Sequence, residues 1–435
     1  MKKILVLIVL YLAIPGSVYL TGQTPYIKQI ITANSGEFEF SPPYQDFVTA
    51  QTYNPVTGAG NVIQTIFTQS VQDICIKGNV AWIAAQDSII KINLDTYQRI
   101  TAIPDSGLSK LLVFGDKLIV SKQYPVTTFF AEVLKADDLS LVSSIKGIPG
   151  DCGGLVAAGD SIYIAVNGGW MGTEGKIAVV ETTGWTLVRE INLGTAAVGI
   201  MNIYLYDNKL FTVNKSPYTS PEVGSISAYN LNNHTFNNSI LNKNVGTGAG
   251  IDDSLLYFGF DYGIGSFNLN TLQVADSVVV SDPGSAVFMY VTSATVDTLN
   301  NLIYMNVGDY ATPGTCFVAT ITGDSVTSFS TGISADAVAV DYRAYPAGIE
   351  NRRGESLLLT LYPNPVSDKL TVTLNTCEEI REIGISDLTG RVVIQNSFNY
   401  RTNLATIPVN ILACGVYAIT VKTDTGSVFG KFVKE

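Results

Sequence analysis

The sequence contains one histidine, His234, in the polar segment Asn232-Asn233-His234-Thr235. Ser-His-Asp and Cys-His mechanisms both need a histidine as the base, and the common zinc, copper and di-iron sites need several histidines or other clustered ligands. Because His234 stands in a polar turn, we expect it to be a solvated turn residue. The sequence therefore predicts no histidine-based catalysis and no metal site.

Carboxylates are the remaining candidates for acid–base chemistry, since a pair of them is the usual equipment of a glycosidase. The adjacent pairs Asp137-Asp138 and Asp252-Asp253 both stand at expected turns, where Asp bonds its own backbone. The Gly-rich phrase Asp151–Gly154 precedes no helical pattern, so it is not a phosphate loop. We predict no catalytic residue and no cofactor, and no motif indicates Ca²⁺. A carboxylate- or Ca²⁺-dependent hydrolase or lyase is the alternative.

Aromatic residues in long polar segments are better candidates, for binding rather than catalysis. The segments 34–46, 121–128, 167–175, 214–224, 261–265 and 307–315 join expected strands and are rich in Gly, Pro, Ser and Thr. Aromatic side chains on exposed loops supply contact area at a low cost in entropy. The predicted ligand-binding residues are Phe38, Phe40, Tyr44, Tyr124, Trp170, Tyr218, Tyr262 and Tyr310.

A repeat determines where these loops lie. A turn with Asp or Asn, one residue and then an apolar pair recurs at Asn79, Asp116, Asp160, Asn208, Asp253 and Asn301, at intervals of 37, 44, 48, 45 and 48 residues. A second polar turn, such as Asn93–Tyr97, follows within each unit. Each unit therefore contains four strands, and four-stranded units at this spacing are typical of a β-propeller.

The chain ends complete the repeat. Residues 335–342 form an isolated first strand, whereas residues 27–32, 47–53 and 61–67 form second, third and fourth strands that lack a first. Together they make one blade, which removes the open edges of the ring. We therefore expect an all-β fold with a seven-bladed propeller over residues 23–345. In such a ring the six long segments lie on one face.

Two phrases in this region, Gly159–Val166 and Lys176–Val180, resemble the YVTN-type, or surface-layer-like, seven-bladed propellers of Bacteroidota. The resemblance covers roughly residues 25–345. The literal tetrapeptide is absent, and Thr212-Val213-Asn214 is its nearest equivalent. A looser resemblance to cobalamin-capturing surface propellers makes a corrinoid one candidate ligand. Those proteins are lipid-anchored, and this chain lacks the anchoring cysteine.

Both termini carry targeting patterns. Residues 1–22 have a basic start, an apolar run of about eleven residues and small polar residues, which is the pattern of a signal peptide rather than of a span of ~20 residues. Residues 346–356 (PAGIENRRGES) are a predicted linker. Residues 357–435 contain short strand patterns between Pro, Asn and Gly turns, so we predict a small Ig-like β-sandwich.

The phrases of this last domain resemble the C-terminal sorting domain of the type IX secretion system. They are a Y-P-N-P start, a D-x-x-G-R turn, a G-x-Y strand and a basic end. The resemblance implies that this domain engages the secretion machinery, that the protein crosses the outer membrane, and that it is then released or attached to the cell surface. The matching residues are Pro363, Asn364, Pro365, Gly390, Arg391, Gly415, Tyr417, Lys431 and Lys434.

Composition and cysteine content limit the remaining options. The net charge is −11 and 14% of residues are charged, so the chain has few of the Lys and Arg residues that nucleic-acid binding needs. The five cysteines leave at least one unpaired; Cys377 and Cys414 could form a disulfide, and the sequence leaves this open. We predict an extracellular or surface-attached, non-catalytic binder of a small nutrient, a glycan or a protein. A structural or adhesive surface component is a further alternative.

Overall fold

The structure, a computed structural model, describes residues 25–39, 43–217, 220, 223–344, 359–374, 379–398, 402–423 and 427–435. The described residues form two compact units, one ending at Arg343 and the other beginning at Ala344. Strands dominate both units, which confirms the all-β class. No helix in the described part of the chain is long and apolar enough to cross a membrane. The predicted signal peptide and linker lie outside the described residues.

The first unit contains six four-stranded antiparallel sheets, each built from four consecutive strands. Three short 3₁₀ turns, Gly169–Met171, Thr195–Ala197 and Ser285–Val287, interrupt the connections. The strands, sheet by sheet, are β4 (Asp73–Lys77), β5 (Val80–Ala85), β6 (Ser88–Asn93), β7 (Arg99–Pro104); β8 (Leu108–Phe114), β9 (Lys117–Lys122), β10 (Ala131–Lys135), β11 (Leu141–Ser144); β12 (Cys152–Ala158), β13 (Ser161–Val166), β14 (Lys176–Glu181), β15 (Thr186–Asn192); β16 (Ile200–Tyr206), β17 (Lys209–Asn214), β18 (Ser225–Asn230), β19 (Phe236–Ile240); β20 (Val245–Asp252), β21 (Leu255–Phe260), β22 (Gly263–Asn268), β23 (Gln273–Val280); β24 (Tyr290–Asp297), β25 (Leu302–Gly308), β26 (Pro313–Thr320) and β27 (Ser325–Ile333).

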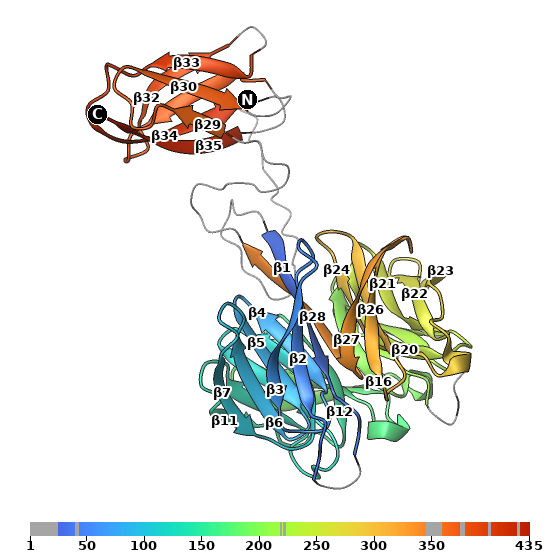
Figure 1. The fold of residues 1–435 in the computed structure, drawn as a ribbon. Coiled ribbons are helices and arrows are strands. Elements are labelled where there is room, and N and C mark those ends of the chain that lie inside the picture. The colour runs from blue at the N-terminus through green and yellow to red at the C-terminus, as the bar shows by residue number, and fades with distance from the viewer. Residues whose placement is uncertain are drawn as a thin grey trace, which may run out of the picture. The chain divides into compact units, whose positions relative to one another are not determined.

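A seventh four-stranded sheet in this unit combines both ends of the repeat region. Its order is β28 (Ala337–Ala344), β1 (Pro25–Asn34), β2 (Val48–Tyr53) and β3 (Gly60–Ile66). Figure 1 shows β28, in orange, beside β1, in blue. These are the strands that the sequence assigns to one composite unit. The pairing brings together segments about 300 residues apart in the chain, as the hydrogen bond from Ser35 N to Ser334 O illustrates (2.8 Å).

Burial differs systematically among the four strands of a sheet. The second strands, such as β13, have nearly every residue buried, because both faces of the sheet are covered. The fourth strands, such as β23, are mostly exposed. The first strands contact the first strands of neighbouring sheets, β4 with β8 and β12 with β16. The first strands are therefore innermost and the fourth strands form the outer wall.

Apolar clusters join each sheet to the next. Ile31 of β1 packs with Ile83 of β5, and each later pair of consecutive sheets shares a cluster of its own. A further cluster contains Ile30 and Tyr304, and so joins the last of these sheets to the composite sheet. In that cluster the rings of Tyr53 and Phe329 stack with centroids 3.8 Å apart. The succession of sheets thus returns to its starting point.

The second repeated polar turn has a consistent geometry. In the turn after β6, the side-chain oxygen of Asn93 accepts hydrogen bonds from the backbone N–H groups of Asp95 (2.8 Å) and Thr96 (3.0 Å). Asn230 and Asn268 do the same in later sheets. In most of these turns the left-handed backbone falls on the fifth residue. Examples are Tyr97 (φ 59°), Trp185 (φ 55°), His234 (φ 60°) and Leu272 (φ 57°).

The second unit consists of a three-stranded and a four-stranded antiparallel sheet around one core. The core contains Leu370, Ile383, Ile419 and Phe432, all fully buried. The strand order is β29-β30-β33 in one sheet and β32-β31-β34-β35 in the other. The bounds are β29 (Leu359–Tyr362), β30 (Lys369–Leu374), β31 (Glu382–Ser386), β32 (Val392–Ser397), β33 (Leu404–Pro408), β34 (Gly415–Lys422) and β35 (Ser427–Lys434).

The structure answers the question about the cysteines. Cys414 is an exposed free thiol, so the Cys377–Cys414 disulfide is not formed; Cys377 itself lies outside the described residues. Cys152 and Cys316 are buried free thiols. Burial raises the pKa of both thiols, which therefore stay protonated and behave as small core side chains.

Candidate functional site

The loops between second and third strands share one end of the sheets with the connections from one sheet to the next. Backbone hydrogen bonds join the two kinds of segment: Gln123 N to Gly107 O (2.7 Å), Gly199 N to Glu174 O (3.0 Å) and Asp261 N to Asn244 O (2.8 Å). We call this surface of the first unit the long-loop face. The hairpins between first and second strands, and between third and fourth, lie at the opposite end.

Large apolar side chains are exposed very unevenly between the two ends. Among the described turns of the opposite end, Val56 is the exposed large apolar residue. A concentration of exposed apolar groups on one face of a soluble domain is typical of an interaction surface. On the long-loop face the exposed set includes Phe38, Tyr44, Tyr124, Phe129, Trp170, Met171, Val223, Tyr262, Val287, Phe288 and Tyr310.

The predicted binding residues divide into three groups. Tyr124 and Trp170 are the most exposed, at 82% and 77%. Tyr44, Tyr262 and Tyr310 are partly covered; the ring of Tyr310 lies 5.9 Å from that of Tyr290, and burial is the main cause that raises its pKa. Phe38 is exposed, while Phe40 and Tyr218 lie outside the described residues. The structure thus brings the six described residues to one face, and their role in binding stays a prediction.

One predicted loop is much shorter than expected. The segment 261–265 is only the two-residue turn Asp261-Tyr262, because β22 already begins at Gly263, opposite Phe260. Both turn residues have positive φ (50° and 73°), as a tight hairpin of the I′ kind requires. Gly263 fits because a Cβ there would lie 2.3 Å from Val280 O. Tyr262 still lies at the tip of the β21–β22 hairpin, on the long-loop face.

The loops of Tyr124 and Trp170 meet at Asp151. A Cβ on Gly169, beside Trp170, would lie 2.1 Å from Asp151 Oδ2, so the backbone of that loop touches the carboxylate. Burial raises the pKa of Asp151, and a hydrogen bond from the backbone N–H of Tyr124 opposes this. Asn167 Oδ1 accepts from Gly169 N (2.9 Å) and orders the Trp170 turn. The exposed rings of Tyr124 and Trp170 therefore lie on two loops that both contact Asp151.

Sequence reasoning missed several residues of this face, and Val287 and Phe288 are among the most exposed of them. They lie in the connection between β23 and β24, both about 70% exposed. Asp282 holds this turn by accepting from Gly284 N and Ser285 N (2.8 Å each). The available signal was the turn phrase Asp282-Pro283-Gly284, which stands two residues before the apolar pair Val287-Phe288.

Several charged side chains near the innermost strands of this face have protein partners. Lys110 Nζ lies 3.3 Å from Asp73 Oδ1 and 3.0 Å from Gln72 O. Asp336 accepts from the hydroxyls of Ser35 and Ser334. No group of three metal-binding side chains occurs among the described residues. His234 stands in its expected turn at the opposite end, bonded to the Tyr229 hydroxyl (2.9 Å).

The motif residues of the second unit have visible structural roles. Asn364 accepts from Val433 N (2.9 Å) and donates to Lys431 O (3.3 Å), which fixes the P-N-P segment, Pro363 to Pro365, against β35. Tyr417, two residues after Gly415, stacks on Phe432 at 5.7 Å and donates to Ala413 O (2.9 Å). The turn residues Asp387, Gly390 and Arg391 bond one another. Lys434 is nearly buried and Lys431 is exposed.

Comparison with known proteins identifies this second unit. Residues 360–435 match the family described as "Secretion system C-terminal sorting domain". These residues are a type IX sorting domain. The protein is therefore exported through the type IX system to the cell surface or the extracellular space. No match to the chain is found among the curated proteins.

Two solved structures resemble the chain at low identity. One is the computationally designed Ika8 protein, with a TM-score of 0.44 and 12% identity, covering 84% of this chain and 96% of that one. The other is BamB from Moraxella catarrhalis, with a TM-score of 0.42 and 14% identity, covering 75% of this chain and 100% of that one.

Proposed function

We propose that residues 25–344 form a seven-bladed β-propeller of the surface-layer-like, YVTN-type class, which binds a ligand through its long-loop face after export. The seven four-stranded sheets and the apolar clusters that join each to the next support the propeller. The sorting domain supports delivery of this propeller to the outside of the cell. Residues 357–435 would be its contact with the type IX machinery.

The observation that carries the binding proposal is the uneven exposure of aromatic side chains. Covering an exposed Trp or Tyr removes a large apolar area from water while its polar edge can still hydrogen-bond. Tyr124 and Trp170 combine high exposure with fixed loops, so little entropy is lost when they bind. A small nutrient, a glycan or a protein would use such a surface, and we propose binding without turnover.

A capture experiment with face-specific variants tests this proposal. The exported chain is equilibrated by dialysis with fractions of spent growth medium and of envelope glycans, and bound compounds are identified by mass spectrometry. Tyr124→Ala with Trp170→Ala should weaken capture at least about tenfold, since truncating an aromatic anchor commonly costs 1 kcal/mol or more. Val56→Ala, on the opposite face, should leave capture unchanged.

Melting temperatures separate binding from folding in this experiment. Both aromatic side chains are exposed, so their removal should leave the melting temperature within about 2 °C of the parent. Unchanged capture by the double variant, or equal losses in the double variant and in Val56→Ala, would refute a binding role for this face.

A further inference from the structure

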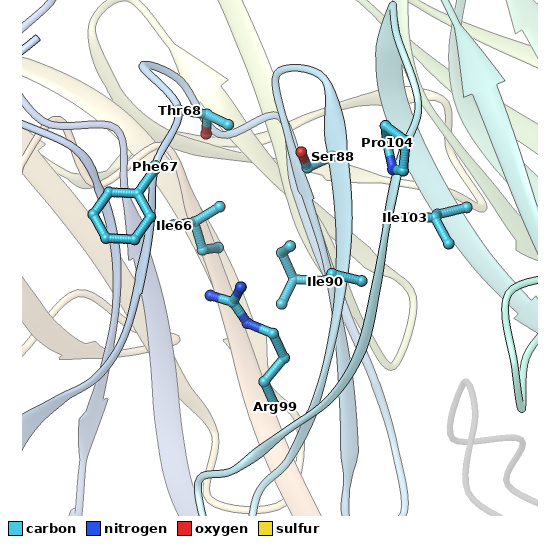
Figure 2. A pocket seen from close by; sticks show the side chains of 9 residues that line it. Ile66, Phe67, Thr68, Ser88, Ile90, Arg99, Ile103 and Pro104 are labelled. Atoms are coloured by element: carbon cyan, nitrogen blue, oxygen red, sulfur yellow. The ribbon is translucent and has the colours of Figure 1, made fainter. Parts of the chain in front are cut away.

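An open groove of about 290 Å³ lies on the outer wall of the first unit and begins at the connection that follows β3. Figure 2 shows it between the end of β3 and strands β6 and β7. Ile66 and Ile90 are almost fully buried beneath it, and Phe67 packs edge-on against Phe47 at 5.1 Å. The lining residues are Ile66, Phe67, Thr68, Ser88, Ile90, Arg99, Ala102, Ile103 and Pro104.

Arg99 places a positive charge at one end of this apolar surface (Figure 2). Its Nη2 donates to Thr65 O (3.0 Å) and lies 3.4 Å from Gln64 Oε1, and both of these acceptors are neutral. No carboxylate of the described residues pairs with it, although the chain carries a net charge of −11. A guanidinium with donors to spare fits a carboxylate, which it can hold through two parallel hydrogen bonds.

The opposite end of the groove has hydroxyl groups. Figure 2 shows Thr68 and Ser88 there, away from Arg99. Thr68 is only 8% exposed, and its hydroxyl oxygen has no hydrogen-bond partner among the described residues. A buried hydroxyl without a partner is costly, so an incoming N–H or C=O that bonds to it would be favoured.

We propose that this groove binds the C-terminal end of a peptide whose last residues are aliphatic. The terminal carboxylate pairs with Arg99, the aliphatic side chains cover the exposed ring of Phe67 and the half-buried Ile103, and a backbone amide bonds to Thr68. The volume is just below the ~300–1,000 Å³ of pockets that enclose whole small molecules, which favours the end of a chain. A fatty acid would satisfy Arg99 but would bury its hydrocarbon against the hydroxyl of Thr68.

Fluorescence polarisation with the full exported chain tests the proposal. The probe is a fluorescein-labelled glycine-rich pentapeptide that ends in valine-leucine with a free carboxylate, and the comparison probe has a C-terminal amide. The acid should bind saturably and the amide about tenfold more weakly or worse, because a charge-assisted pair is lost. Arg99→Gln should weaken binding of the acid by as much and abolish the preference over the amide.

Two further variants complete the design. Arg189→Gln changes an exposed arginine on β15, the outer strand of another sheet, and should leave binding unchanged. Thr68→Val should weaken binding of both probes while keeping or raising the melting temperature, because an unpaired hydroxyl is removed. If Arg99→Gln does not fold, the Thr68→Val variant and the comparison of the acid with the amide probe still test the groove.

Three results would overturn it. The first is that the acid probe shows no saturable binding up to ~5 mM, which means a binding free energy weaker than about 3 kcal/mol. The second is equal affinity for the acid and the amide probe. The third is an Arg99→Gln variant that binds the acid like the parent. Octanoate that binds with the same dependence on Arg99, when the peptide does not bind, would also overturn it and assign the groove to fatty acids.

Discussion

Arg343 and Asp341 show how single residues hold the two ends of the repeat region together. Arg343 Nη2 lies 2.9 Å from Asp341 Oδ2, and its Nη1 lies 3.0 Å from Asp95 Oδ1 on the next sheet. Gln29 of β1 also donates to Asp341 Oδ2 (2.9 Å). Asp341 is fully buried, and this burial raises its pKa against the opposing effect of Arg343. Two ion pairs of Arg343 and the hydrogen bond from Gln29 thus connect β28, β1 and the turn after β6.

Removal of Arg343 should therefore destabilise the first unit. Arg343→Ala leaves the buried carboxylate of Asp341 without its counter-charge, and breaking a buried pair in this way costs about 3 kcal/mol. Urea unfolding measures the change in the free energy of unfolding. Arg189→Ala, an exposed site, should change it by less than about 0.5 kcal/mol. Equal effects of the two substitutions would show that the pair does not hold the chain end.

Asp336 gives a prediction about pH. Burial raises its pKa, while hydrogen bonds from Ser35 and Ser334 and the charge of Lys110 oppose this. Because the folded pKa lies above the unfolded value of about 3.9, the folded state binds the proton more tightly. Its contribution to stability is then fully present below about pH 4 and decreases as the pH rises through the folded pKa.

Asp336→Asn should remove this pH dependence. The difference in unfolding free energy between parent and variant, measured by urea titration from pH 3.5 to neutrality, should shift in favour of the variant as pH rises. A difference that stays constant with pH, or that shifts the other way, would contradict a raised pKa.

The strands were largely predictable because their burial leaves a direct pattern in the sequence. A second strand such as β13 is covered on both faces and so reads as the apolar run Ile162–Val166. The composite sheet was also foreseeable, because β28 and β1–β3 each carry strand patterns that are incomplete alone. The two-residue turn at Asp261-Tyr262 was not, since its length depends on how far the β21–β22 pairing extends.

The finer features of the candidate sites depend on contacts between sheets, which no local pattern records. The approach of the Trp170 loop to Asp151 and the groove beside Arg99 both combine segments from separate strands or sheets. The exposure of Phe288 likewise depends on where the connection between β23 and β24 lies relative to its neighbours. Sequence spacing indicates which residues lie in loops, but not which of these loops touch.

Gly154 tests the close packing of the innermost strands. A Cβ on Gly154 of β12 would lie 2.7 Å from Asn202 Cα of β16 and 2.8 Å from Met201 O, and both are backbone atoms. Gly154→Ala should therefore cost about 1–3 kcal/mol through overpacking. Gly150→Ala is the matched control, because no atom lies within 4 Å of its Cβ position. Thermal and urea unfolding measure the stability of both variants. If Gly154→Ala were as stable as Gly150→Ala, the close contact between β12 and β16 would be wrong.

At the scale of the molecule, the chain combines a secretion domain with a separate repeat unit that carries the candidate ligand sites. The sorting domain has its own two sheets and its own core, and it forms a separate compact unit. The repeat unit depends on both of its ends, because β28 supplies one strand of the composite sheet. The long loops lie on one face because the sheets follow one another in this order. The proposed ligand sites depend on the same order of sheets.

Amide hydrogen exchange of the intact exported chain, followed by mass spectrometry, tests this arrangement most directly. We expect that peptides covering β28 (Ala337–Ala344) and β1 (Pro25–Asn34) are both strongly protected and lose protection together as urea is added. Exchange of β28 at the rate of unpaired backbone, while β1, β2 and β3 stay protected, would contradict a ring closed by the two ends of the repeat region.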